Sequence, residues 1–321
     1  MAVIIDGFSH LLPKSFADAL HRMYPTDELR ALSALTYFGD MEERVRVLDK
    51  FKIDKQVLTL ARPNIWIDMP RDIALKAARR ANDAVAEAAK QFPDRFIPVG
   101  TLPILSEEFM SECDRCVDDL KMKGIQIFTN MGGRYVDDPE FRWFFLKANS
   151  ARIPIWLHPQ VRVEWSQDFA LDKILGWLFD TSLALCRLVF SGIMEECPDL
   201  MMITHHMGAM VPHFSERING CYIGRDMFPN AKFTTLPKDP LTYFRKFYGD
   251  TVLNGAAHAF ECGYKFFGPD RIIFATDYPF GPQKGERWIE GALHQIRAAD
   301  LPQAEKEQIL GENLERLLKG C

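Results

Sequence analysis

The chain has 321 residues, of which 47 % are hydrophobic and 26 % charged, and its formal net charge is −5 at pH 7. This composition is typical of a globular protein and excludes disordered and fibrous classes. The weak negative charge gives no reason to expect nucleic acid or an anionic membrane surface as a partner. The sequence also contains no apolar run of about 18 residues, which a membrane span would require.

The seven cysteines are scattered and odd in number, which is not the pattern of a disulfide framework. The one close pair, Cys113 and Cys116, lies in Glu107–Lys121, a segment of helical period, and is interpreted as part of an ordinary helix. The segment 1–8 has no basic region and no long apolar stretch, so we interpret it as structure and not as a signal peptide. We therefore expect a cytoplasmic protein.

Short apolar segments rich in β-branched residues recur along the chain. Most are nearly continuous in apolar residues, as expected for strands that are buried on both faces. The eight predicted strands are Val3–Asp6, Lys55–Leu60, Phe96–Pro103, Gly124–Asn130, Ile153–His158, Met201–His206, Phe247–Leu253 and Arg271–Asp277.

The segments between these strands have helical spacing, as in Pro70–Gln91 and Ser106–Met122. Alternating strands and helices predict a parallel sheet, and eight repeats predict a closed (β/α)₈ TIM barrel of the α/β class. The alternative is an open doubly wound sheet, whose glycine-rich phosphate turn does not follow the first strand. Because no linker-like change in composition occurs, residues 1–321 are expected to form a single domain.

Two connections are longer than a barrel needs, residues 159–176 and 222–240. Loops of this length usually bind or cover ligands, so we predict lid or substrate loops over the C-terminal face. Crossover packing or an oligomer contact is the alternative. The dense charge run Glu42–Asp49, with Arg44 and Arg46, predicts a solvated helix face.

Functional groups of a TIM barrel lie at the C-terminal ends of its strands, where the βα loops converge. Half of the eight histidines fall at such positions, together with two aspartates and an asparagine. Imidazole and carboxylate groups are the usual ligands of a catalytic zinc or similar ion. The residues at these strand ends, from which we predict a metal site, are His10, Asn130, His158, His205, His206, Asp250 and Asp277.

Five segments, in this order, resemble the amidohydrolase-related family that includes the aminocarboxymuconate semialdehyde decarboxylase-like enzymes. The segments are Ile5-Asp-Gly-Phe-Ser-His10, Lys123-Gly-Ile-Gln-Ile-Phe-Thr-Asn130, Trp156-Leu-His-Pro159, Ile203-Thr-His-His-Met-Gly208 and Phe274-Ala-Thr-Asp-Tyr-Pro279. The resemblance covers nearly the whole chain and implies a (β/α)₈ barrel, in agreement with the strand count. It also implies an enzyme: family members mostly decarboxylate aromatic or unsaturated carboxylic acids without an organic cofactor, and others hydrate double bonds or hydrolyse lactones and C–C bonds.

By position, the resemblance assigns His10 and His158 as metal ligands. Asp277 matches the aspartate that binds the metal and transfers a proton, and His206 matches the catalytic histidine. His205 is the uncertain neighbour. Because adjacent residues of a strand face opposite sides, only one histidine of the pair is expected to point into the barrel mouth.

Phe8 departs from the family pattern, in which the first strand carries His-x-His or Glu-x-His. The departure removes one ligand and leaves His10, His158 and Asp277 for one divalent ion, which is still an acceptable catalytic site. Zinc is the expected ion and manganese the alternative. A site without metal is a further alternative, because Phe8 replaces the usual first ligand. Leu35 stands where the semialdehyde decarboxylase has a substrate-binding arginine, so that substrate is not expected.

Three functional hypotheses follow. The first is non-oxidative decarboxylation of an aromatic or unsaturated acid, with Asp277 or His206 moving the proton. The second is hydrolysis of a lactone, amide or activated C–C bond by metal- or His206-activated water. The third is a barrel that binds a small molecule without catalysis.

The expected partners are a small carboxylic acid, ester or amide substrate and a second copy of the chain in a homodimer. Four residues in the loops and strand ends are candidates for contact with the substrate, because aromatic walls and polar anchors suit a ring with a carboxylate. These are Arg62, Asn130, Trp165 and Trp177.

Overall fold

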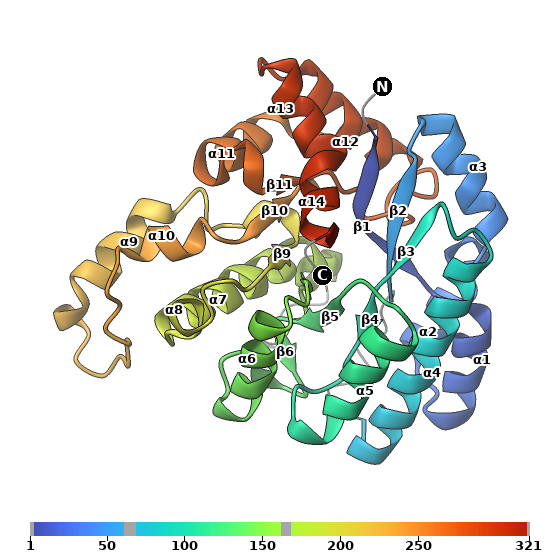
Figure 1. The fold of residues 1–321 in the computed structure, drawn as a ribbon, viewed down its shortest axis with the longest axis horizontal. Coiled ribbons are helices and arrows are strands. Elements are labelled where there is room, and N and C mark those ends of the chain that lie inside the picture. The colour runs from blue at the N-terminus through green and yellow to red at the C-terminus, as the bar shows by residue number, and fades with distance from the viewer. Residues whose placement is uncertain (1–2, 61–68, 162–167, 320–321) are drawn as a thin grey trace.

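The computed structural model describes residues 3–60, 69–161 and 168–319. Two parallel sheets, of strand order β1-β2-β3 and β4-β5-β8-β9-β10-β11, together form a ring (Figure 1). A short antiparallel hairpin, β6 (Asn130–Met131) and β7 (Arg134–Tyr135), lies outside it. The strands of the ring are β1 (Ile5–Leu11), β2 (Lys55–Leu60), β3 (Phe96–Pro98), β4 (Gly100–Thr101), β5 (Ile125–Phe128), β8 (Ile155–His158), β9 (Met202–Thr204), β10 (Tyr248–Asp250) and β11 (Ile272–Ile273).

Strands β3 and β4 together fill one position of the ring. The Val99 amide between them donates to the Leu58 carbonyl of β2 at 3.0 Å, and the Gly100 amide donates to the Gly124 carbonyl beside β5 at 2.9 Å. The ring therefore has eight strand positions, and each overlaps a strand predicted from the sequence.

The ring closes between β11 and β1. The Gly7 amide donates to the Phe274 carbonyl at 2.8 Å, and the Asp277 amide donates to the Phe8 carbonyl at 3.1 Å. The two strands approach so closely that a Cβ at Gly7 would lie 2.4 Å from the Ile273 side chain. These contacts confirm the predicted (β/α)₈ barrel.

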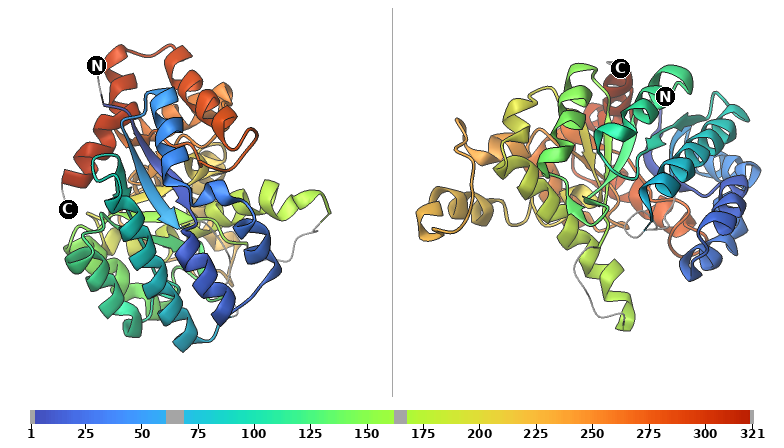
Figure 2. Two further views of the ribbon diagram at one scale, coloured as in Figure 1. Left: turned by 90° about the vertical axis from the view of Figure 1, so that its right-hand side faces the viewer. Right: turned by 90° about the horizontal axis from the view of Figure 1, so that it is seen from below.

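The helices surround the ring, as two perpendicular views show (Figure 2). They are α1 (Lys14–Met23), α2 (Asp27–Ser33), α3 (Met41–Phe51), α4 (Arg71–Lys90), α5 (Met110–Asp114), α6 (Arg142–Ser150), α7 (Trp177–Phe190), α8 (Ile193–Glu196), α9 (Ser215–Ile223), α10 (Pro240–Phe244), α11 (Ala257–Phe267), α12 (Glu286–Ala298), α13 (Gln303–Glu307) and α14 (Asn313–Lys319). None of the helices in the described ranges is long and apolar enough to cross a membrane.

Two separate apolar clusters stabilise the barrel. One fills its interior and includes Phe8, Val57, Trp156 and Ile203. The other lies between the strands and the helices. In α4, buried alanines repeat at helical spacing, and their small side chains let the helix pack closely on the strands. Cys113 and Cys116 are buried and free in the helical segment that was predicted for them.

The described parts of the two long connections project from the barrel. The segment just before α7 extends to one side, and α9 with the chain that follows it extends to another (Figure 2). The first connection contains a π-helical turn, Asp172–Gly176, and the second a short 3₁₀ helix, Arg225–Met227. Their function as lid or substrate loops stays a prediction.

Candidate metal centre and active site

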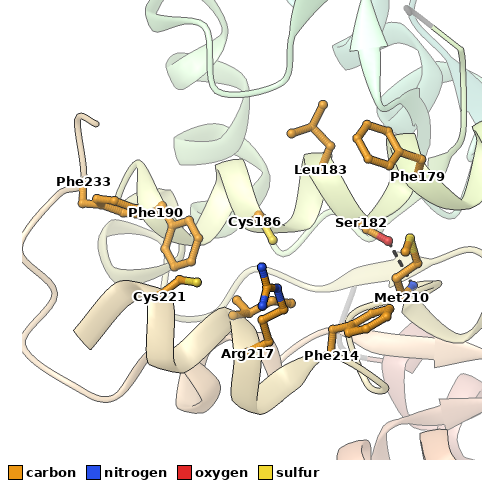
Figure 3. Close-up of a pocket in the computed structure, with 11 residues that line it drawn as sticks. Phe179, Ser182, Leu183, Cys186, Phe190, Met210, Phe214, Arg217, Cys221 and Phe233 are labelled. Atoms are coloured by element: carbon orange, nitrogen blue, oxygen red, sulfur yellow. Dashed lines mark hydrogen bonds between the residues drawn. The ribbon is translucent and has the colours of Figure 1, made fainter. Parts of the chain in front are cut away.

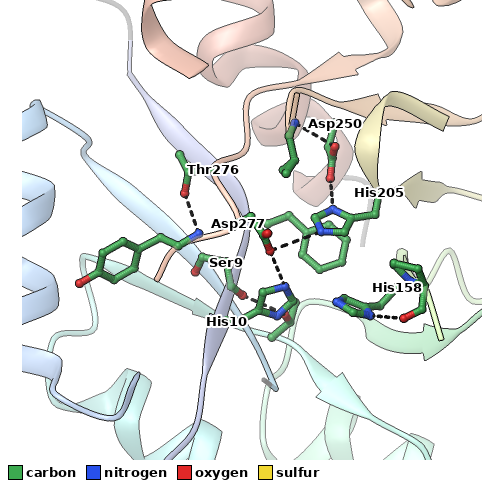
Figure 4. Close-up of polar contacts among 12 residues, drawn as sticks. Ser9, His10, His158, His205, Asp250, Thr276 and Asp277 are labelled. Carbon is green, nitrogen blue, oxygen red and sulfur yellow. Dashed lines mark hydrogen bonds and ion pairs between the residues drawn. The ribbon is translucent and has the colours of Figure 1, made fainter. Parts of the chain in front are cut away.

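Three buried histidines and an aspartate converge at the C-terminal ends of the strands (Figure 4). His10 lies on β1, His158 ends β8, and His205 follows β9; one ring nitrogen of each lies within 4.8 Å of those of the other two. Asp277, after β11, places its Oδ1 atom 3.0 Å from His10 Nε2 and 3.5 Å from His205 Nε2. Residues far apart in the sequence thus form one polar cluster at the barrel mouth.

The hydrogen bonds of His10 and His158 determine which ring nitrogen carries a lone pair. The Thr59 hydroxyl donates to the Ser9 carbonyl at 2.8 Å, so it accepts from His10 Nδ1 at 3.0 Å. His158 Nδ1 donates to the Pro159 carbonyl at 2.7 Å. In the neutral ring of each, Nε2 is then the acceptor and metal ligand.

The resulting arrangement fits a divalent cation. Burial lowers the pKa of His10, so the ring is neutral at neutral pH and its Nε2 lone pair faces the Asp277 carboxylate at 3.0 Å. Two acceptors this close, with no proton to share, need a cation between or beside them. Within the described residues, two groups could hold such an ion, His10 with His158 and His205, and His205 with His206 and Asp277. The set that the resemblance implies, His10, His158 and Asp277, draws on both groups and stays a prediction.

The two adjacent histidines after β9 have different partners. His205 Nδ1 donates to the Asp250 carboxylate, and its Nε2 faces Asp277. His206 is half-buried, and its backbone φ is +55°. The centre of its ring lies 4.0 Å from that of the His205 ring. The sequence motif favours His206 as the catalytic histidine, whereas the hydrogen-bond geometry favours His205. Asp250 therefore orients His205.

The charges of these groups differ accordingly. Burial by itself lowers the pKa of His205, but the carboxylates of Asp250 and Asp277 outweigh it and raise the pKa to about 9. Burial, and then the charge of His205, lower the pKa of His206 to about 3. Burial raises the pKa of Asp277, but the neighbouring imidazoles of His10 and His205 outweigh this and hold the pKa well below its usual range. At neutral pH the cluster holds a proton on His205.

Phe8 occupies the position of the missing family ligand. Its side chain is 0 % exposed, and its ring centre lies 4.3 Å from that of His205, 5.5 Å from that of His10 and 6.1 Å from that of His158. A one-residue register shift between Asp6 and Ser9 accompanies this placement. The ring therefore forms an apolar floor beneath the imidazoles, where it supplies no ligand.

Arg44 on α3 corrects the expectation of a solvated helix face, because its side chain is 0 % exposed. The guanidinium donates to the Gln56 side chain at 2.8 Å and to the His10 carbonyl at 2.5 Å, and it lies 4.7 Å above the Tyr278 ring. Burial lowers the pKa of Arg44 to about 10, so the group stays charged at neutral pH. The alternation of charges along a helix does not reveal which charged side chain faces the core.

The same network continues across the barrel seam. The Gln56 amide donates to the Asp6 carboxylate at 2.6 Å, which also accepts from the Thr276 amide at 3.0 Å and hydroxyl at 2.5 Å. Thr276 precedes Asp277, and Arg44 binds the carbonyl of His10. The network therefore connects the backbones that carry two of the proposed ligands.

Replacing Arg44 by methionine is expected to lower the free energy of unfolding by about 3–5 kcal/mol, because it leaves buried acceptors and the Asp6 carboxylate without their cation. Urea denaturation would measure the loss. Arg46→Met is the matched control on the same helix, since the exposed Arg46 forms a surface ion pair with Glu43, and we expect little change in the free energy of unfolding. Equal losses in the two variants would contradict the assignment.

Two of the four residues predicted to contact the substrate, Asn130 and Trp177, lie within the described ranges. The half-buried Trp177 ring lies 6.1 Å from the His158 ring, edge to face, and so borders the cluster. Asn130 is buried and donates its side-chain amide to the Gln160 carbonyl at 2.6 Å, which anchors the chain after β8. Arg62 and Trp165 lie outside the described residues. Sequence reasoning missed Phe280, whose ring lies 5.4 Å from His10; a conspicuous aromatic two residues after Tyr278 was the available signal.

Most of the chain is similar to known proteins. Residues 39–320 match the family model described as amidohydrolase. The chain is 28 % identical over 279 residues to the 2-amino-3-carboxymuconate-6-semialdehyde decarboxylase of Dictyostelium discoideum, covering 85 % of this chain and 75 % of the relative. It is 28 % identical over 297 residues to a gamma-resorcylate decarboxylase of a Rhizobium species, covering 87 % of this chain and 86 % of the relative.

A solved structure of similar fold contains a metal. It is the 5-carboxyvanillate decarboxylase of Novosphingobium aromaticivorans, in complex with manganese and 4-hydroxy-3-methoxy-5-nitrobenzoic acid. The TM-score is 0.83 at 25 % identity, and the match covers 99 % of this chain and 96 % of that one. The family model matches most of this chain, the barrel is closed, and a His/Asp cluster lies at the barrel mouth. This chain therefore belongs to the amidohydrolase family.

Proposed function

We propose that the protein is a metal-dependent, non-oxidative decarboxylase of a hydroxylated aromatic carboxylic acid. The observation that carries the proposal is the pair of facing acceptors, His10 Nε2 and Asp277 Oδ1, beside His158 at the barrel mouth. The relatives named above are decarboxylases, and the related structure holds an aromatic acid with its manganese.

A divalent ion at His10, His158 and Asp277 would supply a Lewis acid for the carboxylate and a neighbouring oxygen of the substrate. His205 holds a proton at neutral pH because two carboxylates flank it. It can deliver that proton towards the ring carbon that loses CO₂, directly or through Asp277, whose Oδ1 lies 3.5 Å from His205 Nε2. We therefore assign the proton-holding role to His205, and Asp250 is the residue that positions it.

The apolar side chains around the cluster suit a flat substrate. Phe280 lies edge-on to His10, and Phe128 lies edge-on to His158 at 5.8 Å on the side of β5. Trp177 adds a third aromatic edge beside His158. Rings arranged around a polar centre bind an aromatic ring while the polar groups orient its carboxylate.

The test is CO₂ release from a panel of hydroxybenzoates by protein loaded separately with Mn²⁺ and Zn²⁺. The panel includes 2,6-dihydroxybenzoate, 5-carboxyvanillate and 6-methylsalicylate, and the decarboxylated phenol is measured by chromatography. Manganese comes first because the related structure contains it, and zinc is the expectation from the ligand set. The proposal fails if no acid in the panel releases CO₂ with either metal. Proton release from lactones or amides without CO₂ would favour the hydrolase hypothesis instead. Phe8 is compatible with that hypothesis, because it removes one protein ligand and a site with fewer ligands has more room for water.

We further infer that the protein forms a homodimer through the apolar face that α7 and α9 share. A groove of about 420 Å³ separates α7 from α9, and Phe179, Leu183 and Phe214 are among its walls (Figure 3). Nine of the twelve exposed large apolar side chains in the described residues lie between 169 and 228, and Phe169 is 87 % exposed.

The double variant Phe179→Glu and Phe214→Glu is expected to convert a dimer to a monomer, because it places two charges per subunit in an apolar interface. Size-exclusion chromatography with light scattering measures the mass. Leu146→Glu is the control, since Leu146 is similarly exposed on α6 outside this face. A wild-type protein that is monomeric at micromolar concentration would refute the inference.

A further inference from the structure

Gln160, two residues after the end of β8, has a buried side-chain amide without a partner. The residue is 0 % exposed, and within the part of the chain that the structure describes neither its Oε1 nor its Nε2 atom is hydrogen-bonded. A side-chain amide can donate two hydrogen bonds and accept two. Because buried polar groups almost always find partners, an amide that is unpaired at both ends requires an explanation.

The backbone of Gln160 is held firmly, in contrast to its unpaired side chain. Its amide donates to the Thr129 hydroxyl at 2.8 Å. Its carbonyl accepts from the same hydroxyl at 3.2 Å and from the Asn130 side chain at 2.6 Å. These bonds join the chain after β8 to the chain after β5. The unpaired amide is therefore attached to a fixed point of the barrel mouth.

The position of Gln160 places its side chain beside the histidine cluster. His158 ends β8 and contributes its ring to the cluster, and residues two apart in an extended chain face the same side. Neither Pro159 nor Gln160 has a positive φ, in contrast to His206 and Met207 after β9. Gln160 thus continues the inward side of β8 by one step beyond His158, towards the mouth.

The other buried glutamines in the described ranges differ from Gln160 in a useful way. Gln56 donates to Asp6 and accepts from Arg44. Gln126 and Gln295 each donate to a backbone carbonyl, those of Leu60 and Thr251. Each of these three amides therefore has a partner within the chain, which gives it a structural role. The amide of Gln160 has none, so its partner is expected to come from outside the chain.

We propose that Gln160 determines substrate specificity by binding a ring hydroxyl of the aromatic acid. This role rests on the proposed decarboxylase function and adds a contact remote from the carboxylate that the metal would hold. An amide presents a donor and an acceptor side by side, and a hydroxyl offers both in return. A carboxylate only accepts and would leave Oε1 unpaired, and a methyl group would leave both atoms unpaired.

The expected consequence is discrimination between substrates of equal size. A site that is built to bond a hydroxyl rejects an analogue that lacks it, because the buried amide then stays unpaired in the complex. Wild-type protein should therefore favour a hydroxylated acid over the acid with a methyl group at the same ring position, by about tenfold or more.

The experiment compares such pairs with full-length protein loaded with Mn²⁺. 2,6-Dihydroxybenzoate and 6-methylsalicylate form one pair, and the 3-, 4- and 5-hydroxy and methyl derivatives of salicylate form the others. CO₂ release gives kcat and KM for each acid, and isothermal calorimetry gives the Kd of any acid that is not converted. Gln160→Met, of similar shape, should lower the preferred pair's hydroxyl-to-methyl ratio by about tenfold to a hundredfold, mainly through a higher KM for the hydroxylated acid. Its Tm should not fall, because the two polar atoms that it removes have no partners.

Gln295→Met on α12 is the matched control, because Gln295 is equally buried but donates to the Thr251 carbonyl at 2.8 Å. It should lower the Tm and leave the hydroxyl-to-methyl ratio unchanged. A lower Tm in Gln160→Met together with equal losses for both acids of a pair would assign Gln160 a structural role and overturn the proposal. Gln160→Leu takes its place if Gln160→Met does not fold.

The outcomes separate this role from the proposed function. CO₂ release with the same ratio in wild type and Gln160→Met would overturn the role of Gln160 and leave the decarboxylase standing. Selective binding that Gln160→Met abolishes, without CO₂ from any acid, would refute the decarboxylase but support the contact between Gln160 and a hydroxyl. Wild-type protein that neither binds nor converts any of the acids would overturn both.

Discussion

Asp277→Asn is expected to remove the bound metal and to lower kcat for decarboxylation by about 10²–10⁴-fold, the usual contribution of acid–base catalysis. The carboxylate faces both His10 Nε2 and His205 Nε2, so the amide loses a metal ligand and the charge that stabilises the proton on His205. Inductively coupled plasma mass spectrometry measures the metal, and CO₂ release measures the rate.

Two further variants make this result specific. Asp300→Asn, at an exposed position, should change neither metal content nor rate. Asp250→Asn should keep the metal but lower kcat, because Asp250 contacts His205 and none of His10, His158 or Asp277 through its side chain in the described residues. If Asp277→Asn retained one metal per chain, the proposed ligand set would be wrong, whatever its activity. If it kept its activity as well, the non-catalytic hypothesis would gain support.

Phe8→Glu is expected to make the stability of the protein depend on metal. Residue 8 lies two positions before His10 at the floor of the cluster, so a carboxylate there can reach the same ion as His10 and Asp277. Without metal, a buried carboxylate among apolar side chains is costly, and we expect a loss of about 2–4 kcal/mol. With metal, the fourth protein ligand should tighten binding by tenfold or more, and ligation should restore the lost stability.

The measurement is thermal unfolding of Phe8→Glu and wild type, each with chelator and with Mn²⁺, together with a competition titration of Mn²⁺. Phe8→Leu is the control, because it keeps an apolar floor and adds no ligand. We expect Phe8→Leu to lose some packing energy but to retain the Mn²⁺ affinity of the wild type. Equal Mn²⁺ affinities for Phe8→Glu and Phe8→Leu would show that residue 8 does not face the ion.

The barrel itself was predictable from the sequence because hydrophobic periodicity is a local property. Each of the eight strand positions coincides with an apolar run, although β10 and β11 are shorter than the runs Phe247–Leu253 and Arg271–Asp277 that predicted them. The first strand is longer than predicted and includes His10. Parallel strands with helical crossovers then bring all their C-terminal ends to one face. For this reason, His10, His158 and Asp277 could be placed together before any coordinates were known.

The sequence could not choose between His205 and His206 for a physical reason. The strand β9 ends at Thr204, and His206 and Met207 both adopt positive φ, near +55°. Strict alternation of side chains holds only in an extended chain, so it does not apply at this turn. Only the tertiary structure shows that Asp250, on the next strand, accepts the hydrogen bond that turns His205 towards Asp277.

Sequence by itself determined the fold class, the family and the chemical types of the residues at the barrel mouth, because these depend on local patterns and on the order of the strands. Tertiary structure alone decided the burial of Arg44 and the role of Phe8 as an apolar floor. Each of these depends on side chains from elements far apart in the chain. Their mutual distances are set by how the barrel closes, which no local pattern records.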